Sequence, residues 1–240
     1  MSRSEKLETI EGLRPVVEAI RAGRRRVLEV TLPPSGGGPG MDELAWLLRE
    51  AGIASKPGRA GDPVVARAEA FPEETFEELL MEEGPRFLVG LDLVTDVGNL
   101  GSIARSAEAS GVTGLVLEHR RAPPIGAGAM RASAGAIEHL RVGRTPNLRK
   151  ALELAAAEGL SVLVAEPGGH PIEEISTELL SGELVWVFGS EERGTRAAIR
   201  ALATEVVGIP LVGAVASLNV AAAAAFLLLR TAEFRRANRV

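Results

Sequence analysis

The chain has 240 residues, contains no cysteine and carries a net charge of −5, so disulfide bonds and cysteine-ligated zinc are excluded. Apolar residues make up 46% of the sequence but aromatic residues only 3%, so the core must be built from Ala, Val, Leu and Ile. That composition favours an α/β protein with buried parallel strands. The longest apolar run, 220–229, is too short to cross a bilayer, and we expect a soluble, cytoplasmic protein without a membrane partner.

The first 71 residues have the pattern of a small α/β unit. The pattern predicts a helix over 9–23, a strand over 26–32, a loop over 33–40, a helix over 41–52 and a strand over 62–71. Trp46 lies within the second helical pattern and is predicted to be a core residue. The acidic segment 72–85 is predicted to be a linker helix that separates this unit from a larger domain, 86–240.

Strand and helix patterns alternate within 86–240. The predicted strands are 86–94, 114–118, 136–142, 160–166, 183–189 and 205–211, and the predicted helices are 100–111, 147–159, 194–203 and 219–237. Such alternation predicts a parallel sheet with helices on both faces. Ligands of these sheets bind beyond the carboxyl ends of the strands, which is where unusual polar residues stand in this sequence.

Charge is distributed unevenly along the chain. The segment 72–84 holds six glutamates and no basic residue. Because these six negative charges exceed the net charge of −5, the rest of the chain is net positive. Nearly all of that positive charge is arginine, which suits bidentate contacts with phosphate. The composition therefore permits an RNA partner without requiring one.

The first polar junction, DLVTDVGNLGSIARSAEASG, places Asn99 in a turn after a strand and Arg105 on the following helix. Six residues on a helix correspond to about 600°, so these two side chains do not share one face. We interpret Asn99 as an N-cap-like turn residue. Gly98 and Gly101 do not form the glycine fingerprint of dinucleotide-binding proteins, which argues against a nicotinamide-dependent oxidoreductase.

The second junction, WVFGSEERGTRAAI, takes an apolar strand into Gly189, Ser190 and Glu191, with Gly194 close behind. Glycines here would let the backbone approach a ligand closely. The alternative is a helix start with Ser190 as its N-cap and glutamates favouring the helix dipole. Taken by itself, this junction fits both readings.

The third junction, GIPLVGAVASLNVAAAAAFLLLR, places Ser217 and Asn219 between a strand and an alanine-rich helix. Ser217 can cap that helix, which leaves Asn219 unexplained. Asparagine is a poor helix former, so its presence among Leu, Val and Ala points to a role other than packing.

Taken together, the three junctions resemble the motifs of the SpoU–TrmH family of RNA ribose 2′-O-methyltransferases, within the SPOUT group. The matching residues, in the order and spacing of that family, are 99–105, then 189–191 with Gly194, then 209–211 leading to 217–220. Segment 133–140 is similar to the family's intervening segment, and residues 1–70 resemble its small RNA-binding domain more loosely. The resemblance covers 86–236.

The resemblance implies a C-terminal trefoil knot, a homodimer and S-adenosylmethionine bound in the knot. It assigns the cofactor pocket to Ala165, Glu166, Gly189, Ile209, Leu211 and Leu218. Arg105 matches the family's catalytic arginine, and the residues that would orient it, the ribose and the cofactor are Asn99, Glu191, Ser217 and Asn219. Because the pKa of arginine exceeds about 12, we favour Arg105 as a phosphate clamp that stabilises developing alkoxide charge over a general base.

The implied partner is structured RNA, with ribosomal RNA favoured over transfer RNA because an N-terminal domain is present.

Some positions depart from the family pattern: Ala216 stands where Glu is common, Ala221 where Ser or Thr is common, and the small domain lacks a His-Gln-Gly signature. A non-catalytic dimer that binds RNA or cofactor is therefore the alternative. The three histidines are scattered, so no metal site is expected.

Overall fold

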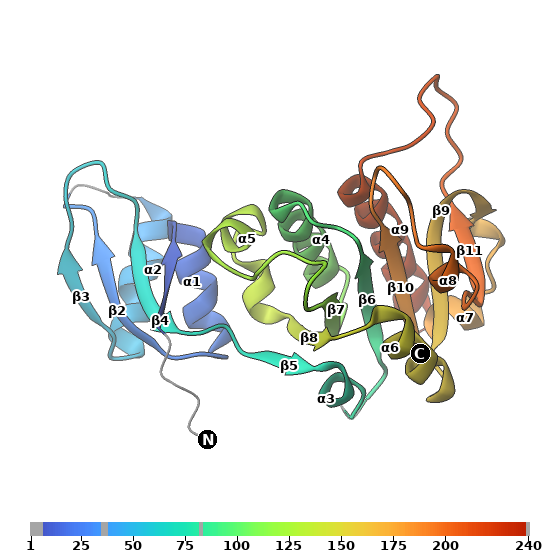
Figure 1. The fold of residues 1–240 in the computed structure, drawn as a ribbon. Helices are drawn as coiled ribbons and strands as arrows, with labels where there is room; N and C mark the ends of the chain where they lie inside the picture. Colours follow the sequence, from blue (N-terminus) through green and yellow to red (C-terminus); the bar gives the residue numbers. More distant parts are fainter. Residues whose placement is uncertain (1–6, 35–37, 82–83, 239–240) are drawn as a thin grey trace. The chain divides into compact units, whose positions relative to one another are not determined.

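The computed structural model describes residues 7–34, 38–81 and 84–238, which divide into two compact units (Figure 1). The smaller unit comprises Met1–Pro72 and Pro124–His139, and the larger comprises Glu73–Pro123 and Leu140–Val240. The inclusion of 124–139 in the smaller unit was not predicted.

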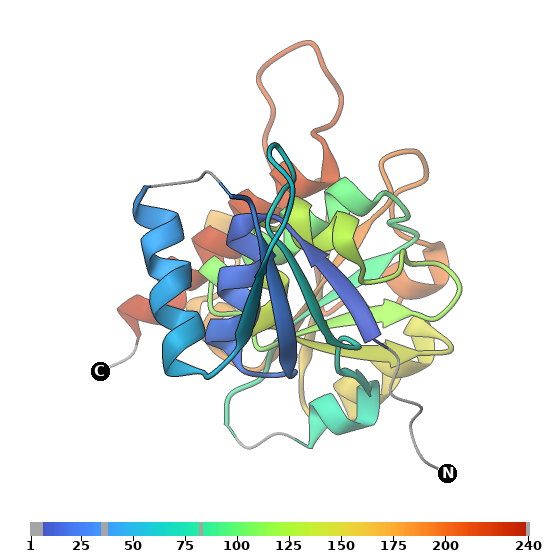
Figure 2. The same ribbon diagram turned by 90° about the vertical axis from the view of Figure 1, so that its left-hand side faces the viewer.

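The smaller unit is built on a four-stranded sheet in the order β1-β4-β2-β3 within the described residues. Its elements are β1 (Leu7–Glu11), α1 (Leu13–Ala22), β2 (Val27–Leu32), α2 (Pro39–Glu50), β3 (Ala54–Pro57), β4 (Val65–Glu69), α5 (Ala127–Ala132) and η1 (Ala136–His139). The sheet is mixed, because β4 runs antiparallel to β1 and β2 whereas β3 runs parallel to β2. Figure 2 shows these strands with α1 and α2 alongside them.

Three predictions in the smaller unit are corrected by the structure. The helix predicted over 9–23 begins only at Leu13, because 7–11 pairs with β4 as the strand β1. The predicted loop 33–40 gives way to α2 at Pro39, and residues 35–37 of that loop lie outside the described residues. The side chain of Trp46 is not core, because this residue is 54% exposed on α2.

Segment 124–139 is tied to the smaller unit by a buried ion pair. Arg25 Nε donates to Glu138 Oε2 over 3.1 Å, and both side chains are 1% exposed. Burial raises the pKa of Glu138, and the hydrogen bond from Arg25 opposes that rise. The strand predicted over 136–142 is therefore wrong at its start, where η1 packs against α1, and only the part from Arg141 onward is strand.

The larger unit contains a seven-stranded sheet in the order β11-β9-β10-β6-β7-β8-β5 within the described residues. Its elements are β5 (Glu73–Thr75), α3 (Phe76–Leu80), β6 (Phe87–Asp92), α4 (Val97–Ala109), β7 (Gly114–Glu118), β8 (Arg141–Thr145), α6 (Leu148–Ala157), β9 (Ser161–Pro171), η2 (Ile172–Glu174), α7 (Thr177–Ser181), β10 (Leu184–Gly189), α8 (Ala197–Arg200), β11 (Glu205–Gly208) and α9 (Val220–Ala237). All the paired strands are parallel. The predicted α/β fold with a parallel sheet is confirmed.

Helices cover both faces of this sheet. Successive side chains of β10 point to opposite faces. Val185 and Val187 join an apolar cluster with residues of α3, α6 and α8. Between them, Trp186 is fully buried on the other face, where its indole Nε1 donates to Thr231 Oγ1 of α9 over 3.1 Å. This double covering explains why every residue of β6 and of β7 is buried.

The acidic segment 72–85 is not the linker helix that its composition predicts. Its first residues form β5, which pairs with β8 at the edge of the large sheet. The short helix α3 follows, and a capping box between Thr75 and Glu78 starts it. Leu79 of α3 is buried against the sheet, where Gly143 leaves room for it. Residues 82–83 lie outside the described residues.

An ion pair joins the starts of the two central strands β6 and β10. Arg86 Nε donates to Glu183 Oε1 over 2.8 Å, and Arg86 Nη2 donates to Glu183 Oε2 over 2.6 Å. The hydrogen bond from the Arg86 side chain is the main cause that lowers the pKa of Glu183 from its ordinary value of 4.5. The ionised form of Glu183 is therefore favoured in the folded protein.

We expect Glu183→Gln to lower the melting temperature near neutral pH and to lose that effect in acid. A carboxylate with a lowered folded pKa stabilises the fold above its unfolded pKa of 4.5, and this contribution disappears as the pH falls through the folded value. Thermal unfolding of both proteins between about pH 7 and pH 3 measures the difference. Glu108→Gln, an exposed change on α4, is the control. An equal difference at both ends of the range would contradict the prediction.

Candidate active site

The three polar junctions of the sequence meet in space at one carboxylate. Glu191, in the loop after β10, accepts at Oε1 from Asn219 Nδ2, from Asn99 Nδ2 over 3.4 Å and from Val220 N over 3.3 Å. Asn219 Nδ2 also donates to Asn99 Oδ1 over 3.0 Å. One residue from each motif therefore contributes to a single polar cluster, which we call the Asn-Glu-Asn cluster (Asn99, Glu191 and Asn219).

The helices α4 and α9 bring two members of this cluster together. They pack side by side, and small buried residues, among them Gly101, Ala104 and Ala224, line them. Asn99 stands in the first turn of α4, and Asn219 immediately precedes α9. Close approach of the two helix starts is therefore a consequence of the small residues behind them.

Helix capping in the site differs from the prediction. The N-cap of α4 is Asp96, whose carboxylate accepts from Asn99 N over 2.7 Å, so Asn99 is inside the helix. The N-cap of α9 is Asn219, whose Oδ1 accepts from Ala221 N over 2.9 Å, so Ser217 is not the cap. The side chain of Asn219 thus both caps α9 and donates to the cluster, which accounts for this residue at a position of poor helix propensity.

The helix start proposed as an alternative reading of Ser190 and Glu191 is absent from the described residues. The loop instead closes on itself: Gly194 N donates to Ser190 O over 2.8 Å, and Arg193 N donates to Ser190 Oγ over 3.3 Å. Helix α8 begins only at Ala197, after Arg196. Glu191 is therefore presented by a tight turn rather than by a helix N-terminus.

Arg105 lies on α4 but outside the cluster. Its side chain is exposed, and within the described residues no hydrogen bond or ion pair involves it. This agrees with the expectation that Arg105 and Asn99 do not share a face of the helix. A guanidinium without a protein partner is available to bind an anion.

A cavity of about 620 Å³ opens beside the cluster at the carboxyl ends of β9, β10 and β11. All six residues predicted to bind cofactor line it: Ala165, Glu166, Gly189, Ile209, Leu211 and Leu218. Glu191 and Ser217 line it as well, whereas Asn99, Arg105 and Asn219 do not. Its volume falls within the range of about 300–1,000 Å³ that is typical of small-molecule sites.

Backbone contact shapes the floor of this cavity. A Cβ atom on Gly189 would lie 2.2 Å from the carbonyl carbon of Gly194. Next to that contact, Thr195 N donates to Glu166 Oε1 over 2.6 Å. The carboxylate of Glu166 therefore holds the loop after β10 as well as lining the cavity, and only glycine fits at position 189.

A second, smaller hollow of about 370 Å³ adjoins the cavity. Asp96 and Asn99 line it, and it shares with the cavity Ser190, Glu191, Arg193 and Val220. The carboxylate of Glu191 thus belongs to both spaces. Two adjoining hollows with a polar group common to both suit a reaction in which a group passes from one bound molecule to another.

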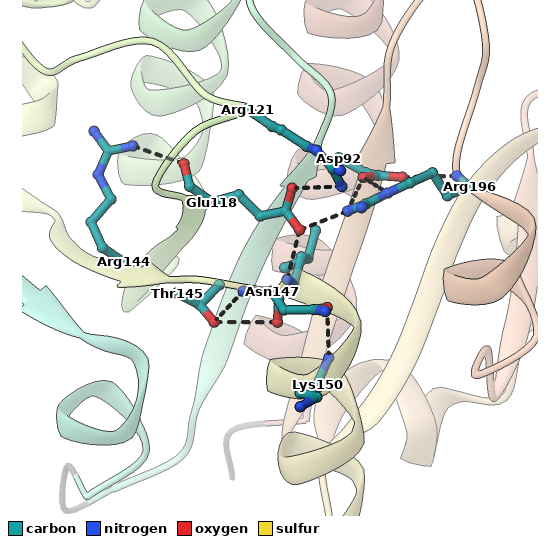
Figure 3. A network of polar contacts seen from close by, with 9 residues as sticks. Asp92, Glu118, Arg121, Arg144, Thr145, Asn147, Lys150 and Arg196 are labelled. Carbon is teal, nitrogen blue, oxygen red and sulfur yellow. Dashed lines mark hydrogen bonds and ion pairs between the residues drawn. The ribbon is translucent and has the colours of Figure 1, made fainter.

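A buried ionic network, which was not predicted from the sequence, lies under the loop after β10 (Figure 3). Arg196 Nε donates to Asp92 Oδ1 over 2.6 Å, and Arg196 Nη2 donates to Glu118 Oε1 over 2.9 Å. Burial opposes the charged form of Arg196, but its hydrogen bond to Glu118 and the negative charge of Asp92 raise its pKa above the ordinary value. The sequence feature that could have predicted this network is a carboxylate residue at the end of each of two buried strands, Asp92 of β6 and Glu118 of β7.

No helix among the described residues has the length and apolarity to cross a membrane. Within the same residues, no three His, Cys, Asp or Glu side chains gather in an arrangement that could hold a metal ion.

Known proteins match the chain in sequence and in fold. Residues 86–229 match the model of the SpoU rRNA Methylase family. An uncharacterized tRNA/rRNA methyltransferase of Mycobacterium avium is 33% identical over 98% of this chain and 80% of its own length. The SpoU methyltransferase AviRb of Streptomyces viridochromogenes, solved with AdoMet, superposes with a TM-score of 0.80 at 24% identity over 97% of this chain and 92% of its own. An RNA 2′-O ribose methyltransferase superposes with a TM-score of 0.77 at 24% identity, covering 98% and 90%.

Proposed function

The chain belongs to the SpoU rRNA methylase family, and we propose that it transfers the methyl group of S-adenosylmethionine to a ribose 2′-hydroxyl of structured RNA. Ribosomal RNA is the favoured substrate. The observation that carries the proposal is the convergence of three separate motifs on Glu191, between two adjoining hollows. The larger hollow would take the cofactor and the smaller one the ribose.

The larger cavity fits S-adenosylmethionine in size and in character. Ile209, Leu211 and Leu218 supply apolar walls, and the backbone at Gly189 supplies a floor without a side chain. When bound, the cofactor supplies an electrophilic methyl group on a positively charged sulfur. The carboxylates of Glu166 and Glu191 outnumber the guanidinium of Arg193 in the lining, which suits a cationic ligand.

The residues of this chain would align and polarise the ribose. Glu191, fixed by Asn99 and Asn219, would accept a hydrogen bond from a ribose hydroxyl and so orient it. Arg105 would bind the adjacent phosphate and stabilise negative charge on the 2′-oxygen as its proton passes to solvent water. The O–CH3 bond forms as the S–CH3 bond of the cofactor breaks, which leaves S-adenosylhomocysteine. Ser217, which lines the cavity, would orient the cofactor.

The trefoil knot and the homodimer belong to this proposal. We infer that the segment 209–219 threads past the loop after β10 before α9 packs on the sheet. Val220 N donates to Glu191 Oε1 over 3.3 Å, so the end of this segment lies beside the loop after β10, which supports the inference. Phe226 and Leu229 of α9, which are 39% and 48% exposed, would be covered by the second copy.

Methyl transfer from labelled S-adenosylmethionine to total RNA, with unmodified transcripts of ribosomal RNA included, tests the proposed function. We expect labelled ribose that resists alkaline cleavage at one nucleotide, because a 2′-O-methyl group blocks attack by that oxygen on the phosphate. Label in a base would contradict ribose specificity. Cofactor binding without transfer to any RNA would favour the non-catalytic binder, for which Ala216 in the cavity lining is the supporting feature.

A further inference from the structure

A group of arginines stands beside the site at the carboxyl edge of the large sheet. We call the side chains of Arg120, Arg121, Arg193 and Arg200 the arginine band. They line two hollows of about 520 and 540 Å³ that share Arg121. All four residues are exposed. They come from the loop after β7, the loop after β10 and the end of α8.

The guanidinium groups of the band make few contacts with carboxylates. Within the described residues, no hydrogen bond or ion pair involves the guanidinium groups of Arg120, Arg193 and Arg200. Arg121 reaches Glu118 only at 3.6 Å, and its side chain remains 52% exposed. The buried carboxylates of Asp92 and Glu118 both pair with Arg196, at 2.6 and 2.9 Å (Figure 3).

The network under the band gives it a rigid base. Arg196 N donates to Asp92 Oδ2 over 2.8 Å, which fixes the chain between Arg193 and Arg200. Glu118 Oε1 also accepts from Leu148 N over 2.9 Å, which fixes the strand end that leads to Arg120. The guanidinium groups therefore project from backbone that is held in place, which lowers the entropy lost on binding.

The band is continuous with the proposed ribose site. Leu93 and Arg193 line both the 520 Å³ hollow of the band and the 370 Å³ hollow that Asn99 and Glu191 line. The backbone of Leu93 has a φ of 61°, a left-handed conformation that is rare for a leucine. Strained backbone of this kind concentrates at functional sites, here at the passage between the two hollows.

We propose that the arginine band binds consecutive backbone phosphates of the RNA strand that carries the target nucleotide. This inference rests on the proposed function and adds a path for the substrate. Guanidinium groups bind phosphate in a bidentate manner, and a row of them suits a chain of phosphates. A protein with a net charge of −5 repels RNA at long range, so binding needs a local surface of opposite sign.

Binding of a fluorescent RNA hairpin, followed by anisotropy with S-adenosylhomocysteine present, tests the band. We expect Arg120→Ala and Arg200→Ala each to weaken binding roughly tenfold, as for the loss of one charged hydrogen bond. The dependence of log affinity on log salt between about 50 and 200 mM becomes shallower by about 0.7–0.9 for each phosphate that is no longer neutralised. Cofactor affinity and melting temperature stay unchanged, because neither residue lines the cofactor cavity.

Arg149→Ala is the matched control. It removes the same charge from an exposed position on α6, where Arg149 pairs with Glu153 and lines neither hollow of the band. Equal affinity and equal salt dependence in the wild type and both band variants would overturn the inference, as would an equal loss of affinity in Arg149→Ala. The readout needs no methyl transfer. A wild type that binds the hairpin but methylates no RNA would contradict the proposed function. The RNA affinities of the two band variants would still test the band in that case.

Discussion

Arg105→Ala is expected to lose methyl transfer while keeping the affinity for S-adenosylmethionine. The side chain is exposed on α4 and does not line the cofactor cavity, so its removal leaves the pocket intact. Alanine is the best helix former, so α4 is not weakened. Loss of a group that stabilises charge in a transition state lowers kcat by about 10²–10³-fold. Single-turnover methylation and calorimetric cofactor binding measure the two quantities.

Two further variants define the role of Arg105. Arg105→Lys keeps the charge but loses the planar fork, so an intermediate rate is expected if the side chain clamps a phosphate. Arg149→Ala removes an exposed arginine from another helix and should turn over like the wild type. Unchanged turnover in Arg105→Ala would refute the assigned role.

Gly189→Ala is expected to abolish cofactor binding and to destabilise the protein. Its Cβ atom would lie 2.2 Å from Gly194 C and 2.4 Å from Thr195 N, which are backbone atoms that cannot rotate away. The loop after β10 would have to move, and that loop carries Glu191 and the Thr195–Glu166 hydrogen bond. Overpacking of this kind costs about 1–3 kcal/mol. Cofactor titration and thermal unfolding measure both effects.

Gly213→Ala is the control for this substitution. Gly213 stands in the neighbouring segment between β11 and α9, and a Cβ atom there meets nothing within 4 Å. Its free energy of unfolding should change by less than about 0.5 kcal/mol, and cofactor affinity should stay the same. Wild-type affinity and stability in Gly189→Ala would show that the close contact does not shape the pocket.

Local sequence patterns were sufficient to identify most strands and the chemistry of the site. Strands buried on both faces are continuous aliphatic runs, so β6, β7 and β10 stand out without knowledge of their neighbours. Glu191, which follows such a run closely, and Asn219, a poor helix former among Leu, Val and Ala, were conspicuous as polar residues. The order of the motifs then pointed to the family.

Short or polar elements were harder to predict because their partners are distant. The strand β1 forms through pairing with β4, and β5 forms through pairing with β8, although the composition of 73–75 is acidic. Trp46 is apolar and lies in a periodic helix, yet it faces outward. Propensity cannot register a pairing or a burial that tertiary contacts decide.

The sequence by itself determined the parallel α/β architecture and the family, and it predicted six residues that line the cavity. These inferences were possible because each motif is a run of residues close together in the chain. Only the tertiary structure decided which of them touch. Asn99 and Asn219 are 120 residues apart and share a hydrogen bond, and Arg25 and Glu138 are 113 residues apart and form a buried pair. The Asp92–Arg196–Glu118 network and the arginine band above it arise in the same way, since parallel strands gather their carboxyl ends at one edge whatever their separation in sequence.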